Sequence, residues 1–284
     1  MLGFGLDTGV LAARRQDRVA SGAIVLDFTT GVLPSVVTLT RASAATVVNA
    51  TGQQVSVAAD VPRFDHDRQT GAPLGLLVET GVSNFVIHAD LRTHPHGNNT
   101  NIQAMPAVTG PDGKTGSVYR LTQGAQSSTF LKLGQFSGSD AKVISLWVKA
   151  MGADTDFQFY ADGSAGISPV KTATGDWVRA FHSAARSGQW GLNNGSDTYG
   201  SDILIALPQI EFGLTPSSYI PTSGNGVDRA PDLVRVDGIN GMFDVTLRYG
   251  SGVEEIRTAQ NISDGWWPSL SAPHLARIIL RPSA

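Results

Sequence analysis

Apolar and polar residues alternate along most of this chain, in short runs separated by glycine, proline and asparagine. In the run over 143–149, Ile144, Leu146 and Val148 share one face, which must be the buried one. A period of two is typical of a β-strand with one face in a core. Such runs recur at roughly ten-residue spacing, which favours an all-β antiparallel sandwich over alternating strands and helices.

Turn-rich stretches divide this pattern into four predicted parts. Before residue 23 the chain is rich in glycine and arginine, and it is either a frayed terminus or an arm that orders against a partner subunit. We expect the last part to pack on the sandwich or on a neighbouring chain. The predicted parts are an attachment arm over 1–22, a small β-rich N-terminal unit over 23–88, a sandwich over 89–232 and a C-terminal β extension over 233–284.

Composition and charge narrow the set of functions. The chain has 284 residues, a net charge of −3 and only 16% charged residues, so it lacks the basic face that a nucleic-acid partner requires. It has no cysteine, which excludes disulfides and thiolate metal sites. We also see no secretory signal and no apolar run long enough for membrane insertion. The sequence therefore predicts a protein made in a cytoplasm.

Two blocks of residues resemble a known family. The segment over 207–224 reads LPQIEFGLTPSSYIPTSG and is followed by Asp228, Arg229 and Asp232. The earlier block comprises TRASAAT at 40–46, PRFDHD at 62–67, GLLVE at 75–79 and SNF at 83–85. Over about 25–232, the two blocks together resemble head-spike and fibre proteins of tailed phages and gene transfer agents, which carry a carbohydrate-binding jelly roll.

The resemblance implies a fold and a function. It places a jelly roll over about 90–232 and implies a virion surface protein that binds host-cell surface or capsular polysaccharide for adsorption, without turnover. The arm would attach to other virion or capsid proteins. Weak single sites gain strength by repetition, so we expect a homo-oligomer, either a trimer or a pentamer. Sugar-binding jelly rolls of this kind often hold a structural Ca²⁺, although no dense run of aspartates marks its ligands here.

Aromatic residues beside amides are the predicted glycan contacts. A flat ring can stack on the C–H face of a sugar, while neighbouring amides hydrogen-bond its hydroxyls. We expect such rings to line an open groove on the sandwich. The predicted contacts are Trp190 and Tyr199, together with Gln189, Asn193, Asn194 and Tyr160.

Catalytic patterns are scarce. Glycoside hydrolysis needs two carboxyl groups about 5–10 Å apart, but Glu254 and Glu255 are neighbours in a strand and face opposite ways. Glu79 and Glu211 lie in the family-like blocks, where we expect structural hydrogen bonds. His94 and His96 are expected in a solvated loop. We therefore predict no enzyme, and keep a structural decoration or adaptor subunit and a capsule-depolymerising enzyme as alternatives.

Overall fold

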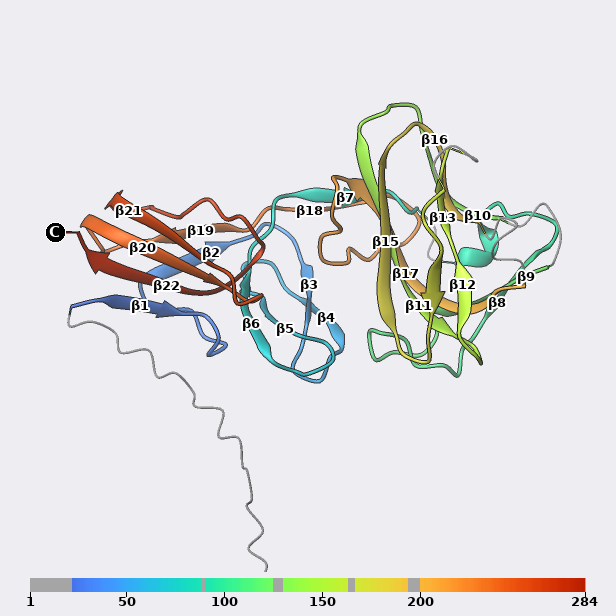
Figure 1. Ribbon diagram of the computed structural model, residues 1–284, viewed down its shortest axis with the longest axis horizontal. Coiled ribbons are helices and arrows are strands. Elements are labelled where there is room, and N and C mark those ends of the chain that lie inside the picture. Colours follow the sequence, from blue (N-terminus) through green and yellow to red (C-terminus); the bar gives the residue numbers. More distant parts are fainter. Residues whose placement is uncertain (1–21, 88–89, 125–129, 163–166, 194–199, 284) are drawn as a thin grey trace, which may run out of the picture.

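The structure is a computed structural model that describes residues 22–87, 90–124, 130–162, 167–193 and 200–283. In these ranges every element is a β-strand except one short 3-10 helix, η1 (Leu91–Thr93), and every strand pair is antiparallel. The predicted all-β antiparallel class is confirmed. Almost all of the predicted attachment arm lies outside the described residues. Figure 1 shows two β-structures side by side, which we call the first unit and the sandwich.

The first unit is built from both ends of the chain. Its largest sheet has the strand order β21-β20-β22-β6-β5, and β1 also pairs with β22. The strands are β1 (Ile24–Asp27), β5 (Phe64–His66), β6 (Pro73–Leu77), β20 (Gly241–Tyr249), β21 (Glu254–Ile262) and β22 (His274–Pro282). A second layer pairs β2 (Val37–Thr40) with β19 (Leu233–Val236). The core between them includes Phe28, Leu76, Val245 and Ile278.

This arrangement corrects the predicted division of the chain. The regions 23–88 and 233–284 are not a small unit and a separate extension, because their strands share one sheet and one core. The sandwich is inserted between them. The chain enters it through β7 (Val82–Asn84) and leaves through β18 (Val227–Arg229), which pair with each other. Alternation reveals that a strand exists, but it does not identify a partner some 200 residues away.

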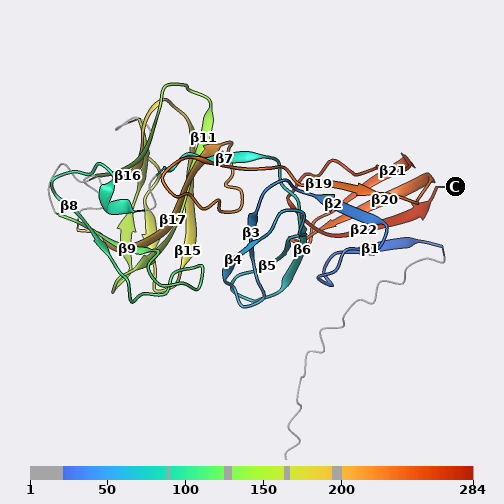
Figure 2. The same ribbon diagram turned by 180° about the vertical axis from the view of Figure 1, so that it is seen from behind.

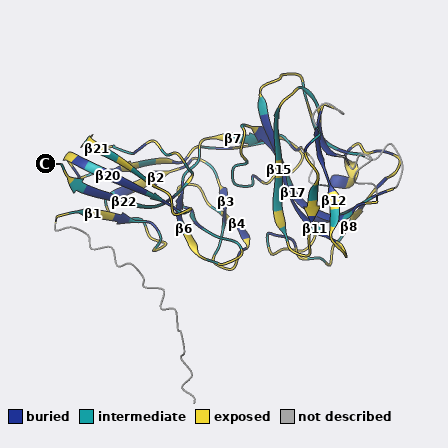
Figure 3. Ribbon diagram, viewed as in Figure 1, coloured by how far each residue is buried: buried dark blue, intermediate teal, exposed yellow. Residues whose placement is uncertain are grey.

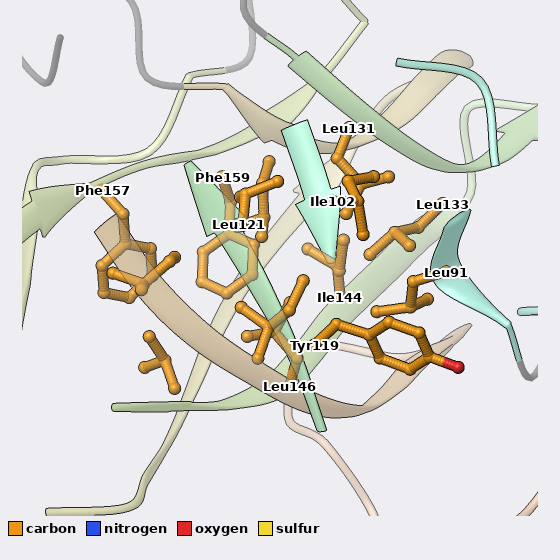
Figure 4. Close-up of a cluster of buried hydrophobic side chains, with 14 of the residues drawn as sticks. Leu91, Ile102, Tyr119, Leu121, Leu131, Leu133, Ile144, Leu146, Phe157 and Phe159 are labelled. Atoms are coloured by element: carbon orange, nitrogen blue, oxygen red, sulfur yellow. The ribbon is translucent and has the colours of Figure 1, made fainter. Parts of the chain in front are cut away.

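The sandwich has two facing sheets around one apolar core. One sheet has the order β15-β11-β17-β9-β8 and the other β10-β16-β13, while β12 pairs with β14 beside them. Leu121, Ile144 and Phe159 are among the buried core residues, and Figure 4 shows them between the sheets. The strands are β8 (Thr100–Ala104), β9 (Val118–Gln123), β10 (Phe130–Phe136), β11 (Ala141–Ala150), β12 (Thr155–Phe157), β13 (Phe159–Ala161), β14 (Lys171–Ala173), β15 (Val178–Ala185), β16 (Gly188–Asn193) and β17 (Asp202–Phe212).

The outer face of the five-stranded sheet is also covered at its centre. The strands β3 (Ala45–Val48) and β4 (Gln54–Val57) form a hairpin, and Figure 2 shows them between the first unit's largest sheet and the sandwich. Trp147 on β11 donates a hydrogen bond from Nε1 to Oε1 of Gln54 at 3.2 Å. The guanidinium of Arg68 lies 4.3 Å from the Trp147 ring centroid. β11 is therefore buried on both faces, as Figure 3 shows.

Five charged residues of the two family-like blocks form a buried ionic network where the two structures meet. Arg63 donates to Asp232 and, at 2.7 Å, to Oε2 of Glu79. Asp232 also accepts from Nη1 of Arg41 at 3.0 Å, and Arg229 pairs with Glu79 at 3.2 Å. The side chains of Arg41, Arg63 and Asp232 have no exposed surface. Charges at this depth are retained only when they are paired and hydrogen-bonded.

The same network holds the segment after β17 in place. Ser218 donates from its backbone nitrogen and its hydroxyl to the carboxylate of Glu79, at 2.8 and 2.7 Å. Glu211 accepts from the backbone nitrogen of Ser217 at 2.6 Å, and Gln209 accepts from that of Ile220 at 2.7 Å. Tyr219 lies between Ser218 and Ile220, so these hydrogen bonds hold its backbone against the sandwich.

Candidate saccharide-binding cleft

The predicted contact Trp190 is not on the surface. It lies on β16 with no exposed area, inside the sandwich core, and its ring packs edge-on against Phe136 with centroids 6.4 Å apart. Its neighbour Gln189 is exposed, because adjacent residues of a strand face opposite ways. The two side chains therefore cannot grip one ligand together, and the prediction that Trp190 stacks on a sugar is wrong for this structure.

Among the other predicted contacts, Tyr160 is buried and the rest lie at or beyond the edge of the described residues. Tyr160 on β13 is only 4% exposed, and burial raises the pKa of its hydroxyl. Asn193 ends β16, and Asn194 and Tyr199 lie outside the described residues. The open aromatic groove that the sequence predicts is thus absent at Trp190 and Tyr160, whose rings are buried.

An open cleft of about 350 Å³ does exist at the edge of the covered face. It lies where η1, the turn before β9 and the segment after β17 converge. Its lining is rich in groups that hydrogen-bond hydroxyls: two carboxylates, one ammonium group and several hydroxyl groups. The lining residues are Asp90, Asp112, Lys114, Thr115, Gly116, Ser117, Tyr119, Leu207, Pro208, Tyr219 and Thr222.

A bulge in β17 contributes Leu207 and Pro208 to the wall. The register against β11 shifts there, so that Ser145 pairs with Gln209 but Trp147 pairs with Ala206. Leu207 has a positive φ of 51°, a conformation that non-glycine residues rarely adopt. Proline after it cannot donate a ladder hydrogen bond, which explains why the strand bulges at this point.

On another side of the cleft, Asp90 is held rigidly. It caps η1 by accepting from the backbone nitrogen of Arg92 at 3.0 Å, and the Arg92 guanidinium also binds its carboxylate, from Nε at 2.9 Å. The hydrogen bond from the Arg92 side chain is the main cause that lowers the pKa of Asp90 to about 2, and the Tyr119 hydroxyl hydrogen-bonds the same carboxylate. Burial, together with the charge of Asp90, raises the pKa of Tyr119.

The opposite wall is a tight turn around Asp112. The turn closes through a hydrogen bond from the backbone nitrogen of Gly110 to the carbonyl of Lys114 at 2.8 Å. Oδ1 of Asp112 accepts from the backbone nitrogen of Lys114 at 3.2 Å and from the Ser117 hydroxyl at 3.1 Å. Such side-chain bonds to the nearby backbone are typical of aspartate in turns. Within the described residues both of these bonds use Oδ1, so Oδ2 is available as an acceptor.

Tyr219 completes the cleft from the third side. Its half-buried ring packs against the apolar cluster around Trp147, and its carbonyl accepts from the Thr46 hydroxyl at 2.6 Å. Burial, assisted by the negative charge of Asp112, raises the pKa of Tyr219 to about 12. Both tyrosines of the cleft therefore keep their protons at neutral pH, while Asp90 is ionised.

This combination suits a polyhydroxylated ligand. Sugar hydroxyls both donate and accept, and the cleft offers carboxylate acceptors beside tyrosine, serine and threonine hydroxyls that can do either. The carboxylate of Asp90 and the turn around Asp112 are fixed by the protein's own hydrogen bonds, so little side-chain freedom would be lost on binding. The volume lies within the range of small-molecule sites.

A second groove, of about 470 Å³, is mainly apolar. Phe85 and Phe136 form its aromatic side, with ring centroids 5.7 Å apart. Its two flexible polar side chains, Lys132 and Gln135, hydrogen-bond each other. It therefore offers few groups that could hydrogen-bond hydroxyls, and the polar cleft is the better candidate for a hydroxyl-bearing ligand.

The described part of the chain holds no group of three or more histidine, aspartate or glutamate side chains that could bind a metal ion. His94 is 4% exposed rather than solvated, and its Nδ1 contacts the carbonyl of Lys132 at 3.1 Å. Within the same ranges, no helix has the length and apolarity needed to cross a bilayer.

Comparisons with known proteins give only distant likenesses. No protein-family model matches the chain, and no curated protein matches it in sequence. The CBM22-1 xylan-binding domain of Xyn10C from Paenibacillus barcinonensis is 14% identical, with a TM-score of 0.34 over 47% of this chain and 94% of that domain. An exo-β-agarase is 11% identical, with a TM-score of 0.35 over 50% of this chain and 25% of that protein. The description of the site therefore rests on this chain's own geometry.

The sequence held partial signals for the cleft. Tyr219 stands between Pro216 and Pro221 in the family-like block, where prolines keep the chain extended. The Gly110–Gly113 turn was recognisable from its composition. The sequence does not predict that this turn, η1 and the segment around Tyr219 lie close together. About 100 residues separate the first two from the third.

Proposed function

We propose that the protein binds a cell-surface or capsular polysaccharide non-covalently in the cleft between Asp90, Asp112, Tyr119 and Tyr219. The observation that carries this proposal is the convergence of two carboxylates and several hydroxyls in one open cleft of about 350 Å³. Asp90, Asp112, Tyr119 and Tyr219 are each held by contacts within the protein, so much of the cleft is preformed.

Binding without turnover is favoured by the state of the carboxyl groups. A hydrolytic carboxyl pair normally includes one general acid with a raised pKa. In the cleft, Asp90 has its pKa lowered to about 2 and is pinned by Arg92. Among the described residues, the carboxyl groups with a clearly displaced pKa are all displaced downwards; they are Asp27, Asp67, Glu79, Asp90, Asp244 and Glu255.

The biological setting that we propose is the surface of a phage or gene transfer agent particle. The family-like blocks support it, and the structure gives those blocks a physical role as the joint that orients the cleft. The arm over 1–22 would bind other virion proteins, and several copies of the chain would present several clefts. Repetition of weak sites raises the overall avidity for a polymer without any new contact.

Adsorption to capsulated cells tests this proposal. We expect the purified protein to sediment with cells that carry capsule and to remain in solution with capsule-free cells of the same strain. Lys114→Ala, which truncates an exposed side chain of the cleft, should reduce sedimentation, whereas Lys149→Ala outside the cleft should not. Equal sedimentation with both cell types would reject polysaccharide as the ligand. Release of reducing ends during incubation would instead indicate the depolymerising enzyme.

A structural adaptor is the second candidate function. Two observations favour it. Gln54 and Arg68 of the first unit contact Trp147 of the sandwich, and buried ion pairs join the two structures. An adaptor predicts no saccharide binding, together with stable association with a second particle protein. The adsorption experiment separates the two functions.

A further inference from the structure

The apolar groove of about 470 Å³ follows one edge of β10. Five successive residues of this strand, 132–136, line the groove. Because successive side chains of a strand face opposite ways, the feature that all five share is the backbone edge of the strand. On the opposite edge β10 pairs with β16. On the groove side, the backbone nitrogen of Lys132 donates to the carbonyl of Pro95 at 2.9 Å, and within the described residues no such bond to another segment follows over 133–136.

An open strand edge beside an apolar groove is a place where a further strand can be added. The added strand pairs its backbone groups with the edge and directs alternate side chains into the groove. β10 belongs to a sheet of three strands that faces a sheet of five, so a fourth strand here would widen the smaller sheet. Phe85 and Ile87 line the groove from the other side, and Ile87 is 44% exposed. The groove therefore fits an extended segment with large apolar side chains at alternate positions.

The part of this chain outside the described residues contains a segment with that pattern. Residues 2–6 read LGFGL, so Leu2, Phe4 and Leu6 stand at alternate positions with glycine between them. In an extended segment the three apolar side chains share one face, and the other face carries no side chain. Five extended residues span about 16 Å, which matches the five residues of β10 that line the groove.

Charge gives the direction of the added strand. Asp7 follows Leu6 directly in the sequence, and all strands of the three-stranded sheet pair antiparallel. An antiparallel segment over 2–6 would run from Phe136 towards Lys132 and would bring Asp7 beside the Lys132 ammonium group. That ammonium group hydrogen-bonds the side chain of Gln135 and has no carboxylate partner among the described residues.

We propose that residues 2–7 of one copy bind the β10 edge of a neighbouring copy as an added antiparallel strand, with Phe4 in the groove. Figure 1 shows β1, the first described strand, in the part of the first unit that lies away from the sandwich, whereas β10 lies in the sandwich. An arm that joins the molecule at β1 would have to pass along both structures to reach its own groove. The contact is independent of saccharide binding and leaves residues 8–21 for other particle proteins.

Two full-length variants each remove one half of this contact. Phe4→Ser removes the anchoring ring and keeps the groove, whereas Ile87→Glu places a carboxylate in the groove and keeps the arm. In sedimentation velocity we expect wild type to associate, and each variant alone to associate at least about tenfold more weakly, as for the loss of an apolar anchor. Val32→Glu, at an exposed position of the first unit, is the matched control and should associate as wild type does. A monomeric wild type, or variants that associate as strongly as wild type, would overturn the proposal.

A mixture of the two variants tests the pairing itself. The arm of the Ile87→Glu protein can still bind the groove of the Phe4→Ser protein, so we expect the mixture to form a one-to-one complex that neither variant forms alone. A mixture that associates no more than its components would overturn the proposal.

A peptide binding measurement tests the groove and the direction of the strand. A fluorescently labelled peptide of residues 1–10 should bind the full-length Phe4→Ser protein in a saturable way. The Asp7→Lys peptide should bind about tenfold more weakly, because hydrogen bonds to charged groups are the stronger ones. Its binding should recover when the protein also carries Lys132→Asp. Failure of the unsubstituted peptide to bind would overturn the proposal, and equal binding of both peptides would overturn the pairing of Asp7 with Lys132.

Discussion

Arg63 and Asp232 are 169 positions apart in the sequence and form an ion pair in which neither side chain is exposed. Arg63 precedes the sandwich and Asp232 follows it, so the pair closes the base of the inserted structure. Both residues belong to the blocks that resemble phage and gene transfer agent proteins. The blocks therefore supply the joint of this molecule, and one of them also supplies Tyr219 to the wall of the cleft.

Removal of one partner from this network should cost much more than removal of a surface pair. Asp232→Asn leaves Arg41 and Arg63 buried without their carboxylate, and we expect a loss of about 3–5 kcal/mol in the free energy of unfolding. Asp237→Asn breaks the exposed pair with Arg235 and should cost less than about 1 kcal/mol. Urea unfolding of the two variants measures the difference. Similar losses would contradict the claim that the buried network contributes more to stability than an exposed ion pair.

The network should also give the fold a specific sensitivity to acid. Burial alone would raise the pKa of Glu79, but the charges of Arg229 and Arg63 and hydrogen bonds from Ser218 outweigh it and hold the pKa below 4.5. The pairing therefore stabilises the fold fully above pH 4.5, and this contribution is lost as the pH falls through the lower folded-state pKa.

Substitution of Glu79 isolates that contribution. At pH 7, Glu79→Gln should be clearly less stable than wild type, and the gap should narrow as the pH is lowered below 4.5, because wild type then loses what the variant lacks. Free energies of unfolding measured from pH 7 to pH 3 give both curves. A gap that stays constant across this range would contradict the pairing of Glu79 in its ionised form.

Trp190 should behave as a core residue. Its side chain is fully buried and packs beside Phe136, so we expect Trp190→Ala to lower the free energy of unfolding by about 3–5 kcal/mol. The adjacent Gln189→Ala should change it by less than about 0.5 kcal/mol. Thermal unfolding of both variants checks the alternation of β16. A Trp190→Ala protein as stable as wild type would indicate that this ring is exposed, and Trp190 would again be a candidate ligand contact.

The strands after Asp232 should be required for the first unit but not for the sandwich. A chain that ends at Asp232 lacks β19–β22, and with them the partners of β1, β2 and β6. Hydrogen exchange should show loss of protection in β6, whereas β11 in the sandwich core should stay protected. Retained protection of β6 would show that the first 88 residues fold without the C-terminal strands.

The sequence predicted the local parts of this fold better than their assembly. The run at 143–149 is a strand where alternation places it, and Ile144 and Leu146 do face the core. The opposite face of that strand is buried as well, because Gln54 and Arg68 reach Trp147 from another part of the chain. Periodicity predicts which residues share a face of a strand, but it does not predict which distant segment packs against that face.

The candidate site was predicted less well for the same reason. The polar, turn-forming residues that follow Trp190 in the sequence favour an exposed ring. A shift of one position along a strand, however, moves a side chain from the surface to the core. Asp90 and Asp112 come from separate turns, and only the tertiary structure brings them to Tyr219. Hydrogen bonds within the turns fix the positions of the two aspartates, but no local sequence pattern predicts that they lie in the same cleft.

Calorimetric titration of capsular oligosaccharides into the purified protein tests the central claim most directly. The account predicts saturable binding to wild type and to Asp154→Asn, an exposed aspartate outside the cleft, with binding weakened about tenfold by Asp112→Asn, since hydrogen bonds to a charged group contribute about 1.5–3 kcal/mol. Asparagine retains the Oδ1 acceptor that holds the turn, so the cleft should keep its shape. Equal affinity of all three proteins would contradict the assignment of this cleft as the saccharide site.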